Sequence, residues 1–175
     1  MTRREREITD INEILQILDT CKIVHLGLVD KDQPYVVPMN YGYTYEQGEL
    51  VLYMHGATKG YKYDLMEVNP KVCFEMECDV NPFPGKTACQ YGTSYSCVMG
   101  KGTAELLTIP EEKMKALSIF MKTQTGKDFE FNEKLVSIVN VIKVTASEFS
   151  AKRRPIPEAM QMDESGVVQE VSSHE

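Results

Sequence analysis

The chain has 175 residues, of which 42% are hydrophobic, and a formal net charge of -7, which suits one globular domain with a single core. No run approaches the roughly 20 apolar residues that cross a bilayer. The charged start MTRREREITD also lacks the apolar region of a signal peptide, so we expect a cytoplasmic protein without membrane contact. The basic residues form no stripe, which argues against nucleic acid as a partner.

The cysteines and histidines indicate no metal centre. The five cysteines have no CxxC spacing, and the three histidines form no pair with metal-ligand spacing. In a chain without an export signal, the cysteines are expected to be reduced thiols.

The first half of the chain predicts a helix, three strands and a second helix. Asp10 and Glu13 have the spacing of a capping box, and apolar residues then recur at helical intervals to Thr20. Alternating apolar residues predict strands over residues 22–29, 35–45 and 50–55. A short helix is expected over residues 59–67.

The second half continues with strands. Residues 71–78 alternate again, whereas residues 81–90 contain two prolines and a glycine and predict a loop. A long strand is expected over residues 94–107, where Gly100 and Gly102 indicate a bulge or a sharp bend. The remaining elements are a helix opened by residues 108–111, a strand over residues 138–149, and a mobile polar tail from Lys152 onward.

These elements define the expected fold class. Six strands with tight turns and two or three helices predict a mostly β domain, built as a small antiparallel barrel with peripheral helices. No GxGxxG motif follows a strand, which excludes a Rossmann arrangement. We assign the domain to residues 1–150 and the acidic tail to residues 151–175.

Pro38 is the first residue with a functional implication. Proline lacks the N–H that a central strand needs, so its strand is expected at a sheet edge, bulged, or facing something other than a strand. Freed backbone groups and Asn40 could then match the carbonyls and N–H of a flavin ring. A plain edge strand protected against aggregation explains the proline as well.

The segment from His55 to Lys62 leaves a strand through small residues and enters a helix. Helix N-termini attract phosphate, Gly56 and Gly60 allow close approach, and Lys62 supplies a cation, so the segment predicts a phosphate site. The alternatives remain open, because a lysine in a first helical turn is more often solvated, and a strand histidine is more often structural than catalytic.

Tyrosines are dense around both features. Alternation places Tyr35, Tyr41 and Tyr43 on one face of the expected strand. Such a face could stack on a flat ring, pack into a core, or form a dimer surface.

Several motifs in order resemble one family. They are R-E-x-x-D at residues 6–10, LGLVD, PYVVPMNYGY, LYMHGA followed by GYK, NPKVCFE, and Tyr95-Ser96-Cys97-Val98. Over residues 3–150 the chain resembles the FMN-binding split-barrel proteins, and within them the pyridoxamine 5′-phosphate oxidase-like proteins of the nitroimidazole-resistance type.

The resemblance implies a six-stranded antiparallel split β-barrel and a homodimer with two FMN molecules at its interface. The residues implied to bind FMN are Val37, Pro38, Met39, Asn40 and Tyr41 at the isoalloxazine, His55, Gly56, Ala57, Tyr61 and Lys62 at the ribityl phosphate, and Ser96 and Cys97 from the long strand or from that of the partner. Two positions depart from the family pattern, because Tyr61 replaces a usual arginine and Tyr95-Ser96-Cys97 replaces a usual Ser-Val pairing.

Three functions follow from this resemblance. The first is an FMN-dependent oxidoreductase of the nitroreductase type acting on a small molecule, with His55 beside the substrate. The second is a flavin- or haem-binding carrier or sensor without turnover, in which His25 or His55 could ligate iron. The third, pyridoxamine phosphate oxidation, needs additional basic residues for a substrate phosphate, and Lys152-Arg153-Arg154 is the one dense basic cluster.

Overall fold

In the computed structural model, which describes residues 4–157, one antiparallel sheet of eight strands forms an incompletely closed barrel. The strand order is β3-β2-β6-β7-β8-β5-β4, and β1 pairs with β8. The strands are β1 Glu7–Ile8, β2 Ile23–Asp30, β3 Gln33–Asn40, β4 Gly42–Glu46, β5 Glu49–Gly56, β6 Lys71–Phe83, β7 Gly92–Leu107 and β8 Asn140–Arg154. The described strands β3 and β4 end the main strand order, and the antiparallel split-barrel fold is confirmed. The sheet has eight described strands where six were expected, because the strand predicted over residues 35–45 is divided in two and the short β1 was not predicted.

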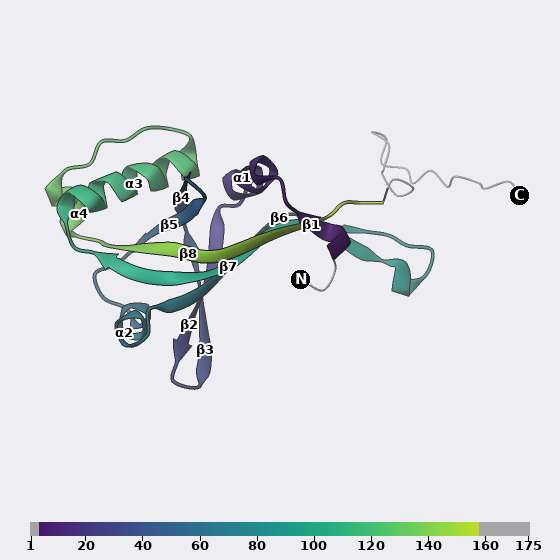
Figure 1. Cartoon of the computed structure of the whole chain (residues 1–175), viewed down its shortest axis with the longest axis horizontal. Coiled ribbons are helices and arrows are strands. Elements are labelled where there is room, and N and C mark those ends of the chain that lie inside the picture. Colours follow the sequence, from purple (N-terminus) through teal and green to yellow (C-terminus); the bar gives the residue numbers. More distant parts are fainter. Residues whose placement is uncertain (1–3, 158–175) are drawn as a thin grey trace, which may run out of the picture.

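Helices surround the sheet at three places. They are α1 Ile11–Thr20, α2 Tyr61–Val68, α3 Pro110–Thr125 and α4 Glu133–Ser137, with short 3-10 turns at Arg4–Arg6 and Ala88–Gln90. Figure 1 shows α3 and α4 together at one end of the long strands β7 and β8, with α1 and α2 on different sides of the sheet. No helix within residues 4–157 is both long enough and apolar enough to cross a membrane.

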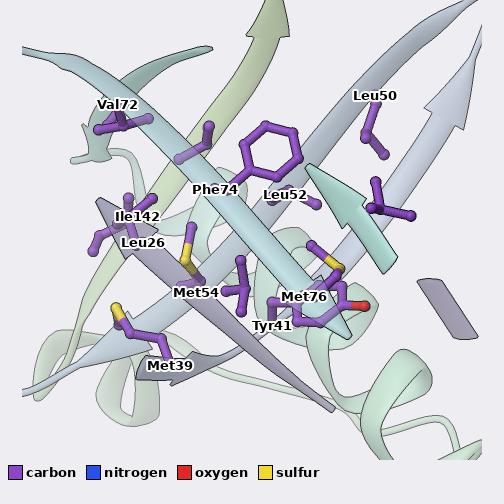
Figure 2. Close-up of a cluster of buried hydrophobic side chains, with 14 of the residues drawn as sticks. Leu26, Met39, Tyr41, Leu50, Leu52, Met54, Val72, Phe74, Met76 and Ile142 are labelled. Atoms are coloured by element: carbon purple, nitrogen blue, oxygen red, sulfur yellow. The ribbon is translucent and has the colours of Figure 1, made fainter. Parts of the chain in front are cut away.

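The core fills the inside of the curved sheet. Figure 2 shows side chains from β2, β3, β5, β6 and β8 converging on one interior, and the largest of them have almost no exposed surface. The labelled members are Leu26, Met39, Tyr41, Leu50, Leu52, Met54, Val72, Phe74, Met76 and Ile142. Their alternation along each strand is the pattern that predicted the strands.

The capping of α1 differs in one respect from the prediction. Asp10 does cap the helix, because its Oδ1 accepts a hydrogen bond from the backbone N–H of Asn12 at 2.8 Å. Glu13 does not complete a capping box. Its Oε2 instead lies 2.8 Å from Nη1 of Arg153, which joins α1 to the end of β8.

The strands near the C-terminus are longer than predicted. The segment expected as a loop at residues 81–90 holds the end of β6 and a 3-10 turn, and β8 continues to Arg154 because Arg154 pairs with Tyr95 of β7. The basic residues expected to open a mobile tail therefore belong to the sheet, and the tail from residue 158 lies outside the described residues. The predicted bulge is present, with a register shift between Lys101 and Gly102.

The strand expected over residues 35–45 is two strands that pair with different neighbours. β3 pairs with β2 and β4 pairs with β5, so the chain changes partners at Tyr41. A Cβ atom on Gly42 would lie 2.4 Å from the Cα of Phe120, so only glycine lets α3 pack this closely against the start of β4. Nε2 of Gln124 donates to the carbonyl of Tyr41 at 2.7 Å and to that of Lys22 at 3.1 Å.

Tyr41 anchors the partner change from inside the core. Its side chain is fully buried, and its hydroxyl donates to the carbonyl of Leu18 at 2.6 Å. Leu18 lies in the last turn of α1, where the carbonyls have no partner within the helix. Burial raises the pKa of Tyr41 well above its usual range, so the phenol stays a donor.

We expect Tyr41→Phe to lower the free energy of unfolding by about 1–3 kcal/mol, because the buried carbonyl of Leu18 would lose its partner. Tyr43→Phe is the matched control, since the hydroxyl of Tyr43 also faces α1 but is less buried, donating to Asp19 at 2.8 Å and to the carbonyl of Leu15 at 3.3 Å. Urea denaturation of the three proteins measures the difference. Equal losses in the two variants would contradict the anchoring role of Tyr41.

Candidate functional site

The candidate site lies where the free edge of β3 faces the end of β5 and the start of α2. A cavity of about 400 Å³ there is lined by Ile23, Val37, Pro38, Met39, Asn40, His55 and Lys62. This volume is within the range of small-molecule sites. The structure thus brings together the Pro38 strand and the His55–Lys62 segment, which the sequence analysis treated as separate features.

Pro38 lies on the described edge strand, as its missing N–H predicted. It pairs in register with His25 of β2, and no other described strand pairs with β3. Asn40 is already engaged in part, since its Nδ2 donates to the carbonyl of Lys22 at 3.0 Å. The edge therefore offers backbone groups that no neighbouring strand uses.

Lys62 and Gly56 form the corner of the cavity at α2. A Cβ atom on Gly56 would lie 3.3 Å from Nζ of Lys62 and 2.6 Å from the hydroxyl of Tyr63, so only glycine lets both groups pack this closely against the end of β5. The Lys62 ammonium lies 4.6 Å from the centre of the Tyr63 ring, and it forms no ion pair with any residue from 4 to 157. The helix begins after Gly60, which has no side chain to cap the first N–H groups. A cation and an uncapped helix start are a suitable environment for an anion.

His55 lies at the end of β5 against α3. Its ring stacks on Phe120 with 4.6 Å between the ring centres and 28° between the planes. Loss of water around the ring lowers the pKa of His55 below its usual value, so the imidazole is neutral at pH 7. A neutral ring at the cavity wall can donate one hydrogen bond and accept another.

The structure places two of the predicted cofactor residues away from the cavity. The Tyr41 side chain lies in the core, because the change of strand partners turns it inward. The Tyr61 hydroxyl donates to Oδ2 of Asp30 at 2.6 Å, and its ring meets that of Tyr35 edge to face at 5.6 Å. Tyr61 therefore ties α2 to the β2–β3 hairpin. Tyr35, Tyr41 and Tyr43 share the inward face that alternation predicted, since Tyr41 belongs to the core and the other two pack against it.

Ser96 and Cys97 do not line this cavity either. Both are buried in β7, and the Ser96 hydroxyl accepts a hydrogen bond from Nε of Arg153 at 3.1 Å. Ala57 is exposed in the turn after β5 and does not line the cavity. The basic cluster at the end of β8 is likewise engaged, since Lys152 lies over the Tyr95 ring and Arg154 over the Phe83 ring.

A titratable cluster on the adjoining strands was not foreseen. Nδ1 of His25 lies 3.4 Å from Oε2 of Glu75 and 3.7 Å from Oε2 of Glu77. Burial and the neighbouring Glu77 carboxylate raise the pKa of Glu75 to about 7, which His25 partly offsets. The alternation of Glu75 and Glu77 was visible in the sequence, but the pairing of β2 with β6 that brings His25 to them was not.

These ligand atoms lie within 4.8 Å of one another, a spacing that a divalent ion could bridge. Partly exposed acidic groups of this kind are common without a metal. We assign no ion to them.

The shifted pKa of Glu75 predicts a pH-dependent stability. Because the folded-state value lies above the unfolded one, its contribution is fully present below about pH 4.5 and is lost as the pH rises through about 7. We expect Glu75→Gln to raise the melting temperature at pH 8 and to have no effect at pH 4.5.

Glu148→Gln is the control, because the pKa of Glu148 is shifted in the opposite direction. Glu148 is exposed and paired with Lys101 at 2.8 Å, which lowers the pKa of its carboxyl, so this variant should not gain stability at pH 8. Melting curves from pH 4.5 to 8 provide the comparison. A lower melting temperature of Glu75→Gln at pH 8 would show that the ionised carboxylate stabilises the fold.

Solved structures share this fold. A candidate 5-nitroimidazole antibiotic resistance protein from Bacteroides thetaiotaomicron VPI-5482 is 29% identical, with a TM-score of 0.72 over 84% of this chain and 86% of that one. A flavocytochrome from Azotobacter vinelandii is 20% identical, with a TM-score of 0.73 over 95% and 76% of the two chains. An FAD and haem binding protein from Mycobacterium smegmatis is 16% identical, with a TM-score of 0.72 over 91% and 77%.

The sequence comparisons give the family. No curated protein sequence matches the chain. The family profile described as pyridoxamine 5′-phosphate oxidase matches residues 10–153, which include every strand from β2 to β7 and nearly all of β8. The chain therefore belongs to the pyridoxamine 5′-phosphate oxidase-like family.

Proposed function

We propose that the protein is an FMN-binding oxidoreductase that acts on a small organic molecule. The observation that carries this proposal is the cavity at the free edge of β3, which apolar side chains of β2 and β3 line together with His55 and Lys62. FMN has matching chemistry, since it joins a largely apolar ring to a phosphate. Bound flavin would supply the electron transfer, which protein side chains cannot perform alone.

The chain's own residues would bind and orient the cofactor. Val37 and Met39 provide apolar contacts, and the unpaired backbone of β3 provides hydrogen bonds to the ring edge. Lys62 would neutralise the phosphate beside the uncapped start of α2. His55, neutral at pH 7, would hold a hydrogen bond to the substrate or pass it a proton at an imidazole nitrogen.

A second copy of the chain would complete this site. Val36 is 60% exposed, Ile23 is 48% exposed and Met99 is 41% exposed, and the strand registers place all three on the outer face of β3, β2 and β7. A further cavity of about 510 Å³ lies on the same face. Because Ile23 also lines the candidate site, a partner seated on this face would cover the cavity. Sedimentation velocity tests this, and a monomer that holds FMN would contradict it.

The finer function, reduction of a nitroimidazole, has the support of the Bacteroides structure named for such resistance. Nothing in the cavity selects a nitro group over another small acceptor. The alternative of a carrier or sensor has support from the structures named for haem and flavin, together with an accessible imidazole at His55.

The first test is the absorption spectrum from 300 to 600 nm after incubation with FMN and removal of the excess. We expect retained flavin bands, and we expect Lys62→Ala to weaken FMN binding by about 1–3 kcal/mol, as for a lost charge-assisted hydrogen bond. Lys59→Ala removes the same charge from an exposed position outside the cavity and is the control. Equal losses in both variants would remove Lys62 from the site, and a Soret band in place of flavin bands would favour the haem-binding alternative.

The second test measures turnover with a reduced nicotinamide as donor and nitroaromatic or quinone acceptors. We expect His55→Ala to retain FMN and to lower turnover by about 10²-fold, the usual effect of losing a positioned acid or base. Lys59→Ala, at an exposed position outside the cavity, should leave turnover close to that of the wild type. Full activity of His55→Ala would make His55 structural.

A further inference from the structure

Tyr63 carries a hydrogen-bonding group that the fold does not use. Within residues 4–157, its hydroxyl is the buried side-chain polar atom that has no hydrogen-bond partner, and the residue is only 7% exposed. Buried phenols normally find a partner, because an unsatisfied hydroxyl costs free energy. An orphaned hydroxyl of this kind therefore requires an explanation.

The hydroxyl lies beside Lys62 at the α2 end of the candidate site. The position that a Cβ atom on Gly56 would occupy lies 2.6 Å from the Tyr63 oxygen and 3.3 Å from the Lys62 nitrogen. The two groups thus pack side by side against Gly56, which no residue with a side chain would allow. Lys62 lines the cavity and its ammonium lies over the Tyr63 ring, so this flexible side chain sits on the cavity side of the phenol. A change of Lys62 rotamer would open the hydroxyl to a ligand without moving the backbone.

The chemistry of the two groups selects the ligand. An ammonium is a donor with no acceptor, and a neutral phenol donates through its O–H. Burial raises the pKa of Tyr63, so it remains protonated at neutral pH. Two donors around one space, one of them charged, fit an oxygen-rich anion such as a phosphomonoester and give no advantage to a neutral hydroxyl.

We propose that the Tyr63 hydroxyl is a second donor to the phosphate of the flavin, beside Lys62, and that it makes the site selective for FMN over riboflavin. This proposal rests on the proposed function. It also accounts for position 61, where the family resemblance leads one to expect an arginine and where the Tyr61 hydroxyl is directed to Asp30 instead. Tyr63, two residues further along α2, would supply the donor that position 61 lacks.

The test compares FMN and riboflavin binding by flavin fluorescence in the wild type, Tyr63→Phe and Tyr61→Phe. We expect Tyr63→Phe to weaken FMN binding by roughly 10- to 100-fold, the range for a hydrogen bond to a charged group, and to leave riboflavin binding unchanged. Tyr61→Phe is the control in the same helix and should leave the preference for FMN intact.

The melting temperature of the flavin-free protein separates a binding role from a structural one. Because the hydroxyl has no partner in the fold, Tyr63→Phe should melt at the wild-type temperature or above it. A lower melting temperature without loss of the FMN preference would overturn the proposal and make the hydroxyl structural. A wild type that binds both flavins with a preference that Tyr63→Phe leaves intact would overturn it while leaving the flavin site in place. A wild type that binds neither flavin would overturn the proposed function and this proposal with it.

Discussion

The change of strand partners at Tyr41 and Gly42 is the constraint on which the rest of the structure depends. Within one residue the chain leaves its ladder with β2 and begins another with β5. Backbone groups at such a crossing lose their sheet partners, and a buried group without a partner is costly. Side chains of α3 replace the missing sheet partners here: Gln124 donates to the Tyr41 carbonyl, and the hydroxyl of Thr123 accepts from the N–H of Tyr43 at 3.4 Å. The open edge of β3 is the consequence, and the candidate site is built on it.

Helix α3 connects this crossing to the chemistry of the site. Its last turns carry Thr123 and Gln124, and one turn earlier Phe120 packs its backbone against Gly42 and its ring against His55. The close approach that requires glycine at position 42 therefore also sets the surface on which the imidazole rests. Since Phe120 removes water from one face of that ring, the same contact contributes to the lowered pKa of His55.

The sequence predicted those features that depend on local pattern. Alternation located the strands, Asp10 located the start of α1, and Pro38 correctly indicated an edge strand. The partner change at Tyr41 could not be predicted, because residues 35–45 alternate without interruption and the break is imposed by α1 and α3, distant in sequence. The tyrosines keep the common inward face that alternation predicted, but their partners could not be predicted, since Tyr41 and Tyr43 bond to α1 and Tyr35 meets Tyr61. The orphaned hydroxyl of Tyr63 was also missed, since it depends on a missing side chain seven residues earlier.

The charges around the cavity favour one orientation of a bound ligand. Lys62 and the uncapped start of α2 lie at one end, so the potential there favours an anionic group. Pro38, at the cavity wall, pairs in register with His25, which in turn contacts the carboxylates of Glu75 and Glu77 on β6. A second phosphate near that pair would face negative charge, which disfavours a phosphorylated substrate at this end. Under the proposed function, the flavin phosphate would lie beside α2 and its ring along β3, and the substrate would be a small molecule without a phosphate.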